Sequence, residues 1–208
     1  IAVKTTIICL LLGYPIAFFI ARSSERVQNI LVLGITIPMW INMLLRTYAW
    51  MNLLSDNGII NNLLAKIGLG PINMMYTDFS VMLGLICNFM PFMIIPIHTS
   101  LNKMDKSLIE AAYDLGANRF QTFWKVIWKL SLPGVVNGIM MVFLLAISSF
   151  VIPKLLGGGQ YMLIGNLIES QFISVGDWNF GSAISMILAV IILLSMSLMK
   201  RMDKEKGE

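Results

Sequence analysis

Five long apolar runs constrain the fold of this chain more than any other feature of its sequence. They cover about 2–21, 30–54, 79–99, 133–153 and 179–199. Each approaches or exceeds the ~20 residues that a helix needs to cross the hydrocarbon core of a bilayer. Hydrophobic residues form 57% of the 208 residues and charged residues only 12%, which is more apolar surface than a soluble domain could bury. The sequence predicts an all-α membrane protein, with residues 1–208 as one transmembrane domain and five visible spanning helices.

The basic residues between these runs predict how the chain is oriented. Eleven of the fifteen would lie on one side of the membrane. They are Arg22, Arg26, Lys103, Lys106, Arg119, Lys125, Lys129, Lys200, Arg201, Lys204 and Lys206. Because cytoplasmic loops carry an excess of Lys and Arg, we expect the 100–131 loop and the C-terminus in the cytoplasm, and the loops 55–78 and 154–178 outside. Charges spread in this way do not favour nucleic-acid binding.

Several function classes lack the residues that they need. No carboxylate lies deep in an apolar run, which argues against a proton-coupled carrier with a titratable relay inside the membrane. The chain has no Gly-rich phosphate loop, no His-Glu-x-x-His pair and no Gly-x-Ser-x-Gly elbow, so ATP hydrolysis and a membrane-embedded enzyme are both disfavoured. Cys9 and Cys87 fall within apolar runs without metal-ligand spacing, and we expect no metal site.

The polar segment between the third and fourth runs predicts two short helices. Ser107 and Glu110 have the spacing of a capping box, and Gly116 supplies a left-handed residue that ends a helix. Asn118 and Gln121 repeat the capping pattern for a second helix. The apolar stripe of the first helix would consist of Leu108, Ile109, Ala112 and Leu115. Such a pair could lie on the membrane surface or dock to a partner protein.

The run Glu110-Ala111-Ala112-Tyr113-Asp114-Leu115-Gly116 resembles the EAA loop of permease subunits in type I, binding-protein-dependent ABC importers. The match extends through Phe123 to Leu132-Pro133-Gly134 but departs from the family at Trp128-Lys129, where a Leu-Pro or similar pair is usual. The resemblance implies that a set of loop residues couples to an ATPase: Glu110, Ala111, Ala112, Asp114, Gly116 and Arg119. A passive channel would have no use for such a loop.

The same resemblance implies the setting of the chain. The permease would be multi-pass in the bacterial cytoplasmic (inner) membrane and would itself bind no cofactor. Its partners would be a second homologous permease subunit, an ATPase dimer that binds ATP and Mg, an extracytoplasmic substrate-binding protein and membrane lipid. Permeases of this family typically have six spans, so we expect a sixth, N-terminal helix to be missing from the chain.

Two further phrases resemble the permeases of spermidine/putrescine importers. One runs from Pro38 to Trp50 and continues at 57–61, and the other comprises Leu163-Ile164-Gly165-Asn166, Gln171-Phe172 and Asp177-Trp178. They imply a polyamine cargo. Ferric ion, sulfate or phosphonate remains the alternative, because importers of those solutes share the EAA loop.

A cationic cargo would favour aromatic faces and carboxylates along its path. The candidates for this path are Trp40, Tyr48, Trp50, Glu169 and Asp177. The alternatives are an aromatic belt at the membrane interface and ordinary solvated loop charge. The two carboxylates flank a short helix expected at about 161–173. We expect Arg46 to have a structural role, such as pairing with an outer-loop carboxylate, since it would repel a cation.

Overall fold

The computed structural model describes the backbone of residues 1–204 and the side chains of 1–105 and 107–197. Lys206, and the side chains of Lys106, Lys200, Arg201 and Lys204, therefore lie outside the described residues. The described chain contains α1 (Ala2–Arg22), α2 (Glu25–Thr36), η1 (Ile37–Trp40), α3 (Met43–Leu54), α4 (Ile59–Lys66), α5 (Asp78–Asn102), α6 (Lys106–Asp114), α7 (Arg119–Thr122), η2 (Phe123–Ile127), α8 (Trp128–Ser148), α9 (Val151–Leu156), α10 (Ile164–Ser170), η3 (Gln171–Val175) and α11 (Trp178–Lys204).

Within the described residues, four continuous helical stretches are long and apolar enough to cross a membrane. They are Ala2–Arg22, Asp78–Asn102, Arg119–Ser148 and Trp178–Ser197. The third stretch joins α7, the π-helical turn η2 and α8. The predicted class, an all-α membrane protein, is confirmed. The four stretches correspond to four of the five predicted runs.

The run expected at 30–54 is not one straight helix. Glu25–Trp40 and Met43–Lys66 meet at an angle of 94°. Ile41 is extended, with ψ 135°, and the side chain of Asn42 caps the new helix by accepting a hydrogen bond from the Leu44 amide at 2.8 Å. The chain therefore turns sharply inside an apolar run, and α3 continues across the end of the bundle.

The run expected at 133–153 also ends early. The helix stops at Ser148, Ser149 is extended with ψ 130°, and α9 begins at Val151. The side-chain nitrogen of Asn166 donates to the Phe150 carbonyl at 2.8 Å, so α10 supplies a partner for a backbone group that the break has left free.

The core of the bundle lies where α5 packs against both α1 and α8. Met93 of α5 is fully buried. A Cβ atom on Gly13 of α1 would lie 3.0 Å from the Met93 Cγ, and a Cβ atom on Gly138 of α8 would lie 2.8 Å from its Sδ. One turn away, a Cβ atom on Gly134 would lie 2.5 Å from the Pro96 carbonyl. The missing side chains allow three helices to approach closely around one methionine.

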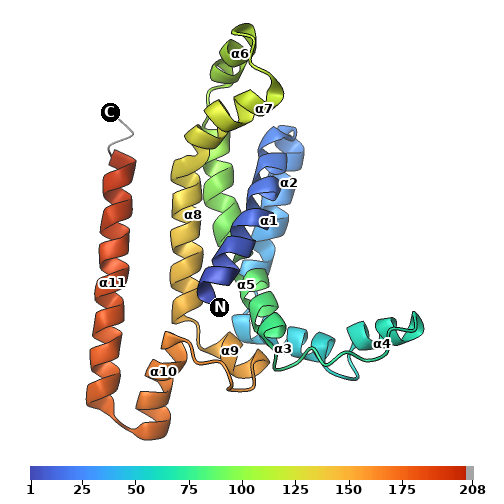
Figure 1. Cartoon of the computed structure of the whole chain (residues 1–208), viewed down its shortest axis with the longest axis vertical. Helices are drawn as coiled ribbons and strands as arrows, with labels where there is room; N and C mark the ends of the chain where they lie inside the picture. Colours follow the sequence, from blue (N-terminus) through green and yellow to red (C-terminus); the bar gives the residue numbers. More distant parts are fainter. Residues whose placement is uncertain (205–208) are drawn as a thin grey trace.

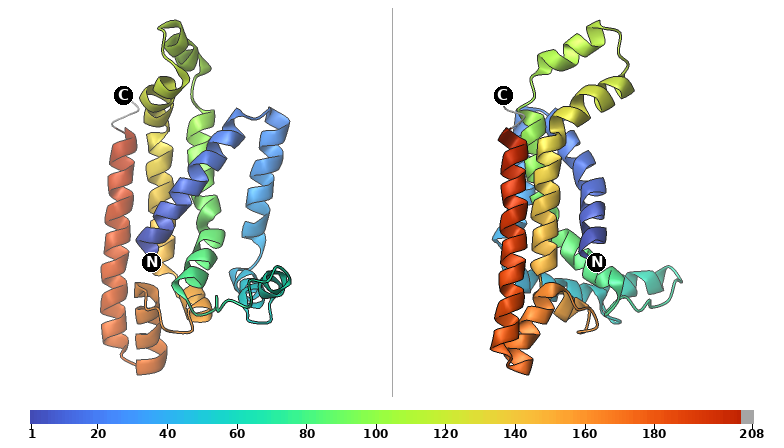
Figure 2. Two further views of the ribbon diagram at one scale, coloured as in Figure 1. Left: turned by 45° about the vertical axis from the view of Figure 1, so that its right-hand side comes forward. Right: turned by 60° about the vertical axis from the view of Figure 1, so that its left-hand side comes forward.

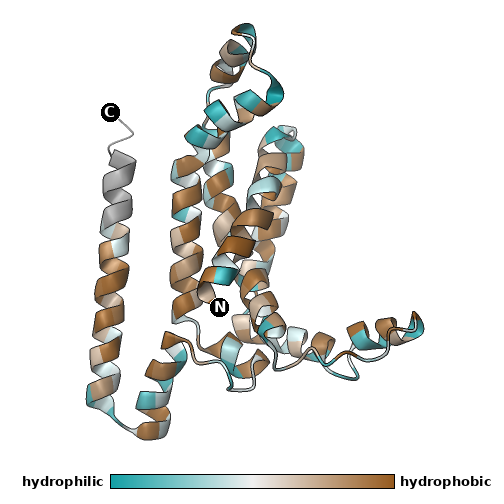
Figure 3. Cartoon of the chain, in the orientation of Figure 1, coloured by the Kyte–Doolittle hydropathy of each residue, from teal (hydrophilic) through white to brown (hydrophobic). Residues whose placement is uncertain are grey.

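The two ends of the bundle differ in character (Figures 1 and 2). α6 and α7 project beyond one end, which also holds the α1–α2 turn and the last described turn of α11. α3, α4, α9 and α10 lie across the other end. Apolar residues cover the long helices, whereas polar residues gather on α6, α7 and the far tip of α4 (Figure 3). α11 stands to one side and meets the remainder through α8, α10 and η3.

Candidate coupling surface and transport pathway

The α6–α7 hairpin (Asp105–Thr122) is built on two caps and one left-handed turn. The Asp105 carboxylate accepts from the Ser107 amide at 2.9 Å, so Asp105 caps α6. The capping box expected at Ser107 and Glu110 is therefore wrong. Hydrogen bonds from the backbone and side chain of Ser107 lower the pKa of the exposed Asp105. The charged carboxylate also suits the positive end of the helix dipole.

The turn between the two helices is as predicted. Gly116 has φ +79°, and its amide donates to the Tyr113 carbonyl at 2.9 Å, while that of Ala117 donates to Ala112 at 3.0 Å. The Asn118 side chain then accepts from the Gln121 amide at 2.8 Å, and the Gln121 side chain accepts from the Asn118 amide at 3.0 Å. This reciprocal pair confirms the second capping box.

The predicted coupling residues lie on the exposed part of this hairpin. Glu110, Ala111, Asp114, Gly116 and Arg119 are exposed, and Ala112 is half-buried. The predicted apolar stripe divides in two. Ile109 is half-buried toward the bundle, whereas Leu108 is exposed and Leu115 is 89% exposed. Apolar side chains held in water beside charges of both signs are typical of a protein-docking surface.

A cavity of about 430 Å³ separates α6 from the bundle. Phe18 and Arg22 of α1, Met104, and Ile109 and Tyr113 of α6 are among the residues that line it. The Arg22 guanidinium carbon lies 4.6 Å from the centroid of the Phe18 ring, a cation–π contact that holds this charge beside the cavity. The hairpin therefore meets the bundle through Ile109, which packs against the core beside this cavity, and through its two chain connections, to α5 and to η2.

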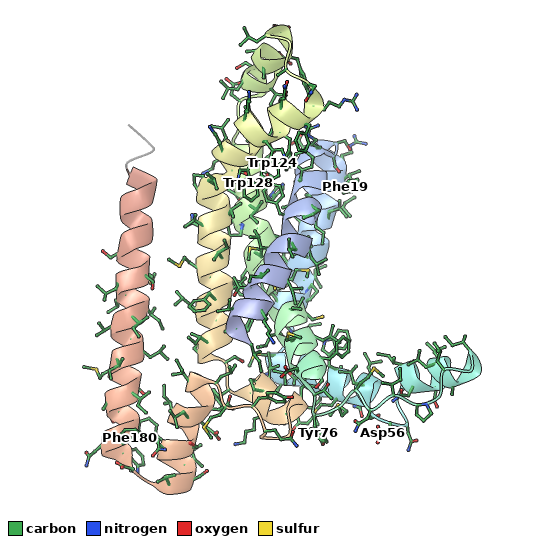
Figure 4. All side chains as sticks on the ribbon, in the orientation of Figure 1. Phe19, Asp56, Tyr76, Trp124, Trp128 and Phe180 are labelled. Carbon is green, nitrogen blue, oxygen red and sulfur yellow. The ribbon has the colours of Figure 1, made fainter. Side chains whose placement is uncertain are left out.

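An aromatic cluster links the hairpin to α1 (Figure 4). The Phe123 ring lies edge-on to Tyr14 at 6.0 Å and to Phe18 at 5.7 Å, and Trp128 lies 5.0 Å from Tyr14, between ring centroids. Trp124 contacts Phe123 and Trp128 at 5.7 Å each. Trp128 is where the sequence departs from the usual EAA pattern. The chain there stays helical, and the indole packs against α1.

The aromatic candidates for a transport path lie at the opposite end and remain separate. Trp40, at the end of η1, is 88% exposed, and Tyr48 of α3 is half exposed. Trp50 is half-buried and packs against the core. Among the described side chains, none of the three forms a ring–ring pair.

Both carboxylate candidates have structural partners. Glu169 of α10 accepts a hydrogen bond from the Lys154 ammonium of α9 at 2.5 Å, and its side chain is only 14% exposed. Asp177 accepts from the Phe180 amide at 3.0 Å and so caps α11. The short helix expected at 161–173 is found as α10 and η3. Arg46 has no carboxylate partner among the described residues, and its Nε and Nη1 atoms are buried without a hydrogen bond.

Sequence reasoning missed a polar junction between α2 and α5. The Gln28 side-chain nitrogen lies 2.9 Å from the His98 Nε2 and 3.2 Å from the Asn102 Oδ1. A cavity of about 480 Å³ beside it extends toward Thr36 and Trp40. A second groove of about 490 Å³ lies between η1, α5 and α8, with Thr99 and Asn137 among its polar residues. The i, i+4 spacing of His98 and Asn102 is the signal that could have indicated a shared polar face.

Comparison with known families decides what this architecture is. The family of binding-protein-dependent transport system inner membrane components matches residues 13–207. The chain belongs to this family. It is a membrane component of a transport system, as the EAA resemblance implied, and the inner membrane is its location.

Relatives of this inner membrane component carry names that specify a cargo. The spermidine/putrescine transport system permease protein PotB of Escherichia coli K12 is 40% identical over 197 residues, covering 94% of this chain and 72% of the relative. PotB of Haemophilus influenzae is 40% identical over 201 residues, covering 96% of this chain and 70% of the relative. The inner membrane ABC transporter permease protein YdcU of E. coli is 29% identical, over 97% of this chain and 68% of its own length.

A solved structure has the same fold. A bacterial ABC transporter involved in the import of the acidic polysaccharide alginate aligns with a TM-score of 0.67 at 18% identity, covering 100% of this chain and 78% of that one. The alignment covers the whole chain, so the overall fold is shared with that transporter chain.

Proposed function

We propose that the chain is the permease subunit of an ATP-driven importer of polyamines such as spermidine and putrescine. The observation that carries the proposal is 40% identity to spermidine/putrescine permeases over 94% of this chain. ATP hydrolysis would come from a separate ATPase dimer that binds ATP and Mg, because the sequence contains no phosphate-binding loop. A second homologous permease and an extracytoplasmic binding protein would complete the transporter.

The α6–α7 hairpin is the surface through which the ATPase would act. Leu108 and Leu115 would enter an apolar depression on the ATPase, while Glu110, Asp114 and Arg119 would form polar contacts around it. Movement of the hairpin would reach α8 directly through η2. It would reach α1 through the contacts of the Phe123 and Trp128 rings with Tyr14.

The hairpin and the C-terminus would face the cytoplasm. Arg22 and Arg26 lie in or beside the α1–α2 turn, at the same end of the bundle as Arg119, Lys125 and Lys129. This clustering supports the orientation, because Lys and Arg are concentrated on the cytoplasmic side of membrane proteins. An ATP-hydrolysing partner must also be on that side.

Polyamine cargo would enter at the opposite end, where Asp56 lies (Figure 4) and where α5 and α11 begin. Asp56, Asp78 at the start of α5 and Asp177 just before α11 are all exposed. These carboxylates would raise the local concentration of a polycation. Trp40 and Tyr48 would offer ring faces to ammonium groups beyond them. Glu169 would have a lesser part, because Lys154 already neutralises it.

The test is substrate-stimulated ATPase activity of the purified transporter in vesicles with its binding protein. Spermidine or putrescine should stimulate hydrolysis, and Asp177→Asn should weaken the response without preventing assembly. Stimulation by ferric ion, sulfate or phosphonate, with none by either polyamine, would overturn the cargo assignment while leaving the family assignment intact.

A further inference from the structure

Residues 57–77, here termed the lateral arm, leave the bundle at a right angle to it. The arm follows α3, beyond the 94° bend, and returns at Asp78, where α5 begins. α4 packs against α3, and Figures 1 and 2 show it reaching sideways, level with the lower ends of α5 and α8. Because the long helices cross the membrane, an element perpendicular to them at their ends runs along the membrane surface.

Hydrogen bonds give the arm a defined conformation. Asn61 of α4 is 2% exposed, and its side-chain amide donates to the carbonyls of Ser55 and Ile72 at 3.1 Å each. Its oxygen accepts from the Ile72 amide at 2.9 Å. Farther along, the Tyr76 amide donates to the Leu156 carbonyl at 3.0 Å. These bonds fix the returning chain against α4 and α9, so the orientation of the arm's surface is defined.

That surface is apolar and poor in charge. Ile59, Leu63, Ile67 and Leu69 are each between 57% and 69% exposed. Ile59 and Leu63 are four residues apart and share one face of α4. Between Asp56 and Asp78 the only charged residue is Lys66. A surface of this kind is unfavourable in water, because exposed apolar side chains gain free energy when they are transferred to an apolar environment.

We propose that the lateral arm is an interfacial anchor that binds the surface of the phospholipid bilayer. Ile59, Leu63, Ile67 and Leu69 enter the boundary between headgroups and acyl chains, and Lys66 pairs with lipid phosphate. Three features favour lipid as the occupant: the direction of the arm, its level at the ends of α5 and α8, and its single positive charge. The absence of carboxylates in 57–77 leaves nothing to attract a cationic cargo.

The one tyrosine of the arm also suits this position. Tyr76, where the arm returns to the bundle, is about half exposed. Tyr and Trp are enriched where one end of the ring meets acyl chains and the other meets water. The position of the arm thus does not depend on which cargo is carried.

The test uses spin labels on the assembled transporter in vesicles of phosphatidylethanolamine and phosphatidylglycerol. In a variant with Cys9→Ala and Cys87→Ala, a label is attached at Leu63→Cys or at Ala65→Cys. Ala65 is also exposed but lies roughly 200° around the helix from Leu63. A label at 63 should collide with oxygen, which concentrates in lipid, several-fold more than with a water-soluble nickel chelate. The ratio should reverse at 65.

Ile67→Cys provides a second site, should the Leu63 variant fail to assemble. Low collision rates with both reagents at 63 and 67 would mean that another protein covers the arm, and would overturn the proposal. Preferential collision with the nickel chelate, falling when the binding protein is added, would overturn it in favour of a protein-docking site on the aqueous side.

Discussion

The hydroxyl groups of Tyr14 and Ser131 lie 3.0 Å apart and join α1 to α8 across 117 residues of sequence. The Ser131 hydroxyl donates to the Trp128 carbonyl at 3.0 Å, so the Tyr14 hydroxyl is the donor of the shared bond. Since Tyr14 is buried, Ser131 is its means of hydrogen-bonding. This one contact fixes the aromatic cluster against the first turn of α8.

Removing the Tyr14 hydroxyl and removing the Ser131 hydroxyl should reduce stability by unequal amounts. Tyr14→Phe keeps the ring and should lower the free energy of unfolding by about 1 kcal/mol, whereas Ser131→Ala leaves a buried hydroxyl unpaired and should cost up to about 3 kcal/mol. The double variant should be less damaged than Ser131→Ala alone. Denaturation of the purified transporter measures all three. Equal losses for the two single variants would argue against this assignment of donor and acceptor.

Gly116 predicts a loss of coupling through backbone strain alone. Its φ is +79°, and a Cβ atom placed on it would have no atom of the described residues, apart from its chain neighbours, within 4 Å. Gly116→Val should cost about 1–2 kcal/mol in the turn and reduce substrate-stimulated ATPase activity. Gly116→Asn, which tolerates this conformation, is the matched control and should stay close to wild type. Full stimulation by the valine variant at normal expression would contradict the prediction.

Asp105, and not Ser107, should control the start of α6. Asp105→Ala should speed hydrogen exchange at the Ser107 amide and its neighbours, while Ser107→Ala should have little effect there. The pKa of Asp105 is lowered in the folded protein, so its contribution is present above the ordinary Asp pKa and is lost as pH falls through the lowered value. Asp105→Asn is the control. Its side chain does not titrate, so the protection of the Ser107 amide in this variant should not change as pH falls through that range.

Glu169 should act through Lys154. If its role is to hold α10 against α9, Glu169→Gln and Lys154→Met should reduce transport to a similar extent, and the double variant should be no worse than either. Spermidine uptake in cells measures the effect, with the assembled complex quantified alongside. A defect confined to Glu169→Gln, with Lys154→Met normal, would instead indicate direct contact with the cargo.

The orientation of the chain predicts which positions react from outside the cell. In the variant lacking Cys9 and Cys87, Gln160→Cys should react with an impermeant maleimide in intact cells, because Gln160 is exposed at the α9–α10 end. Lys125→Cys, near the hairpin, should react only after the membrane is opened. Reaction of position 125 in intact cells would place the hairpin on the wrong side for an ATPase.

Local signals predicted the hairpin well and the bend poorly. Gly116 and the Asn118–Gln121 pair specify their geometry within a few residues, so sequence alone identified them. The prediction that Ser107 caps α6 was wrong because Asp105, two residues earlier, competes for the same helix terminus, and both residue types are good caps. At Asn42 the surrounding run is apolar on both sides, and hydropathy does not distinguish a straight helix from one that turns through 94°.

Long-range contacts explain what remained unpredicted in the candidate site. The pairing of Lys154 with Glu169 and the junction of Gln28 with His98 depend on how separate helices are placed. We expected Arg46 to pair with a carboxylate. Its helix, α3, follows the 94° bend and lies along the end of the bundle, so Arg46 is not where a straight helix would have placed it. The unpredicted bend thus changed the surroundings of the α3 residues that follow it.

Met93, enclosed between Gly13 and Gly138, packs α1, α5 and α8 into one rigid unit. Helices packed backbone to backbone around one side chain cannot slide past each other without opening a void, so they tilt together. α8 alone has 21 residues and is about 32 Å long. If the proposed ATPase moves the hairpin, a small rotation of α8 there would become a larger displacement at its far end. Ser149, which is extended directly after α8, would be the joint that absorbs this displacement.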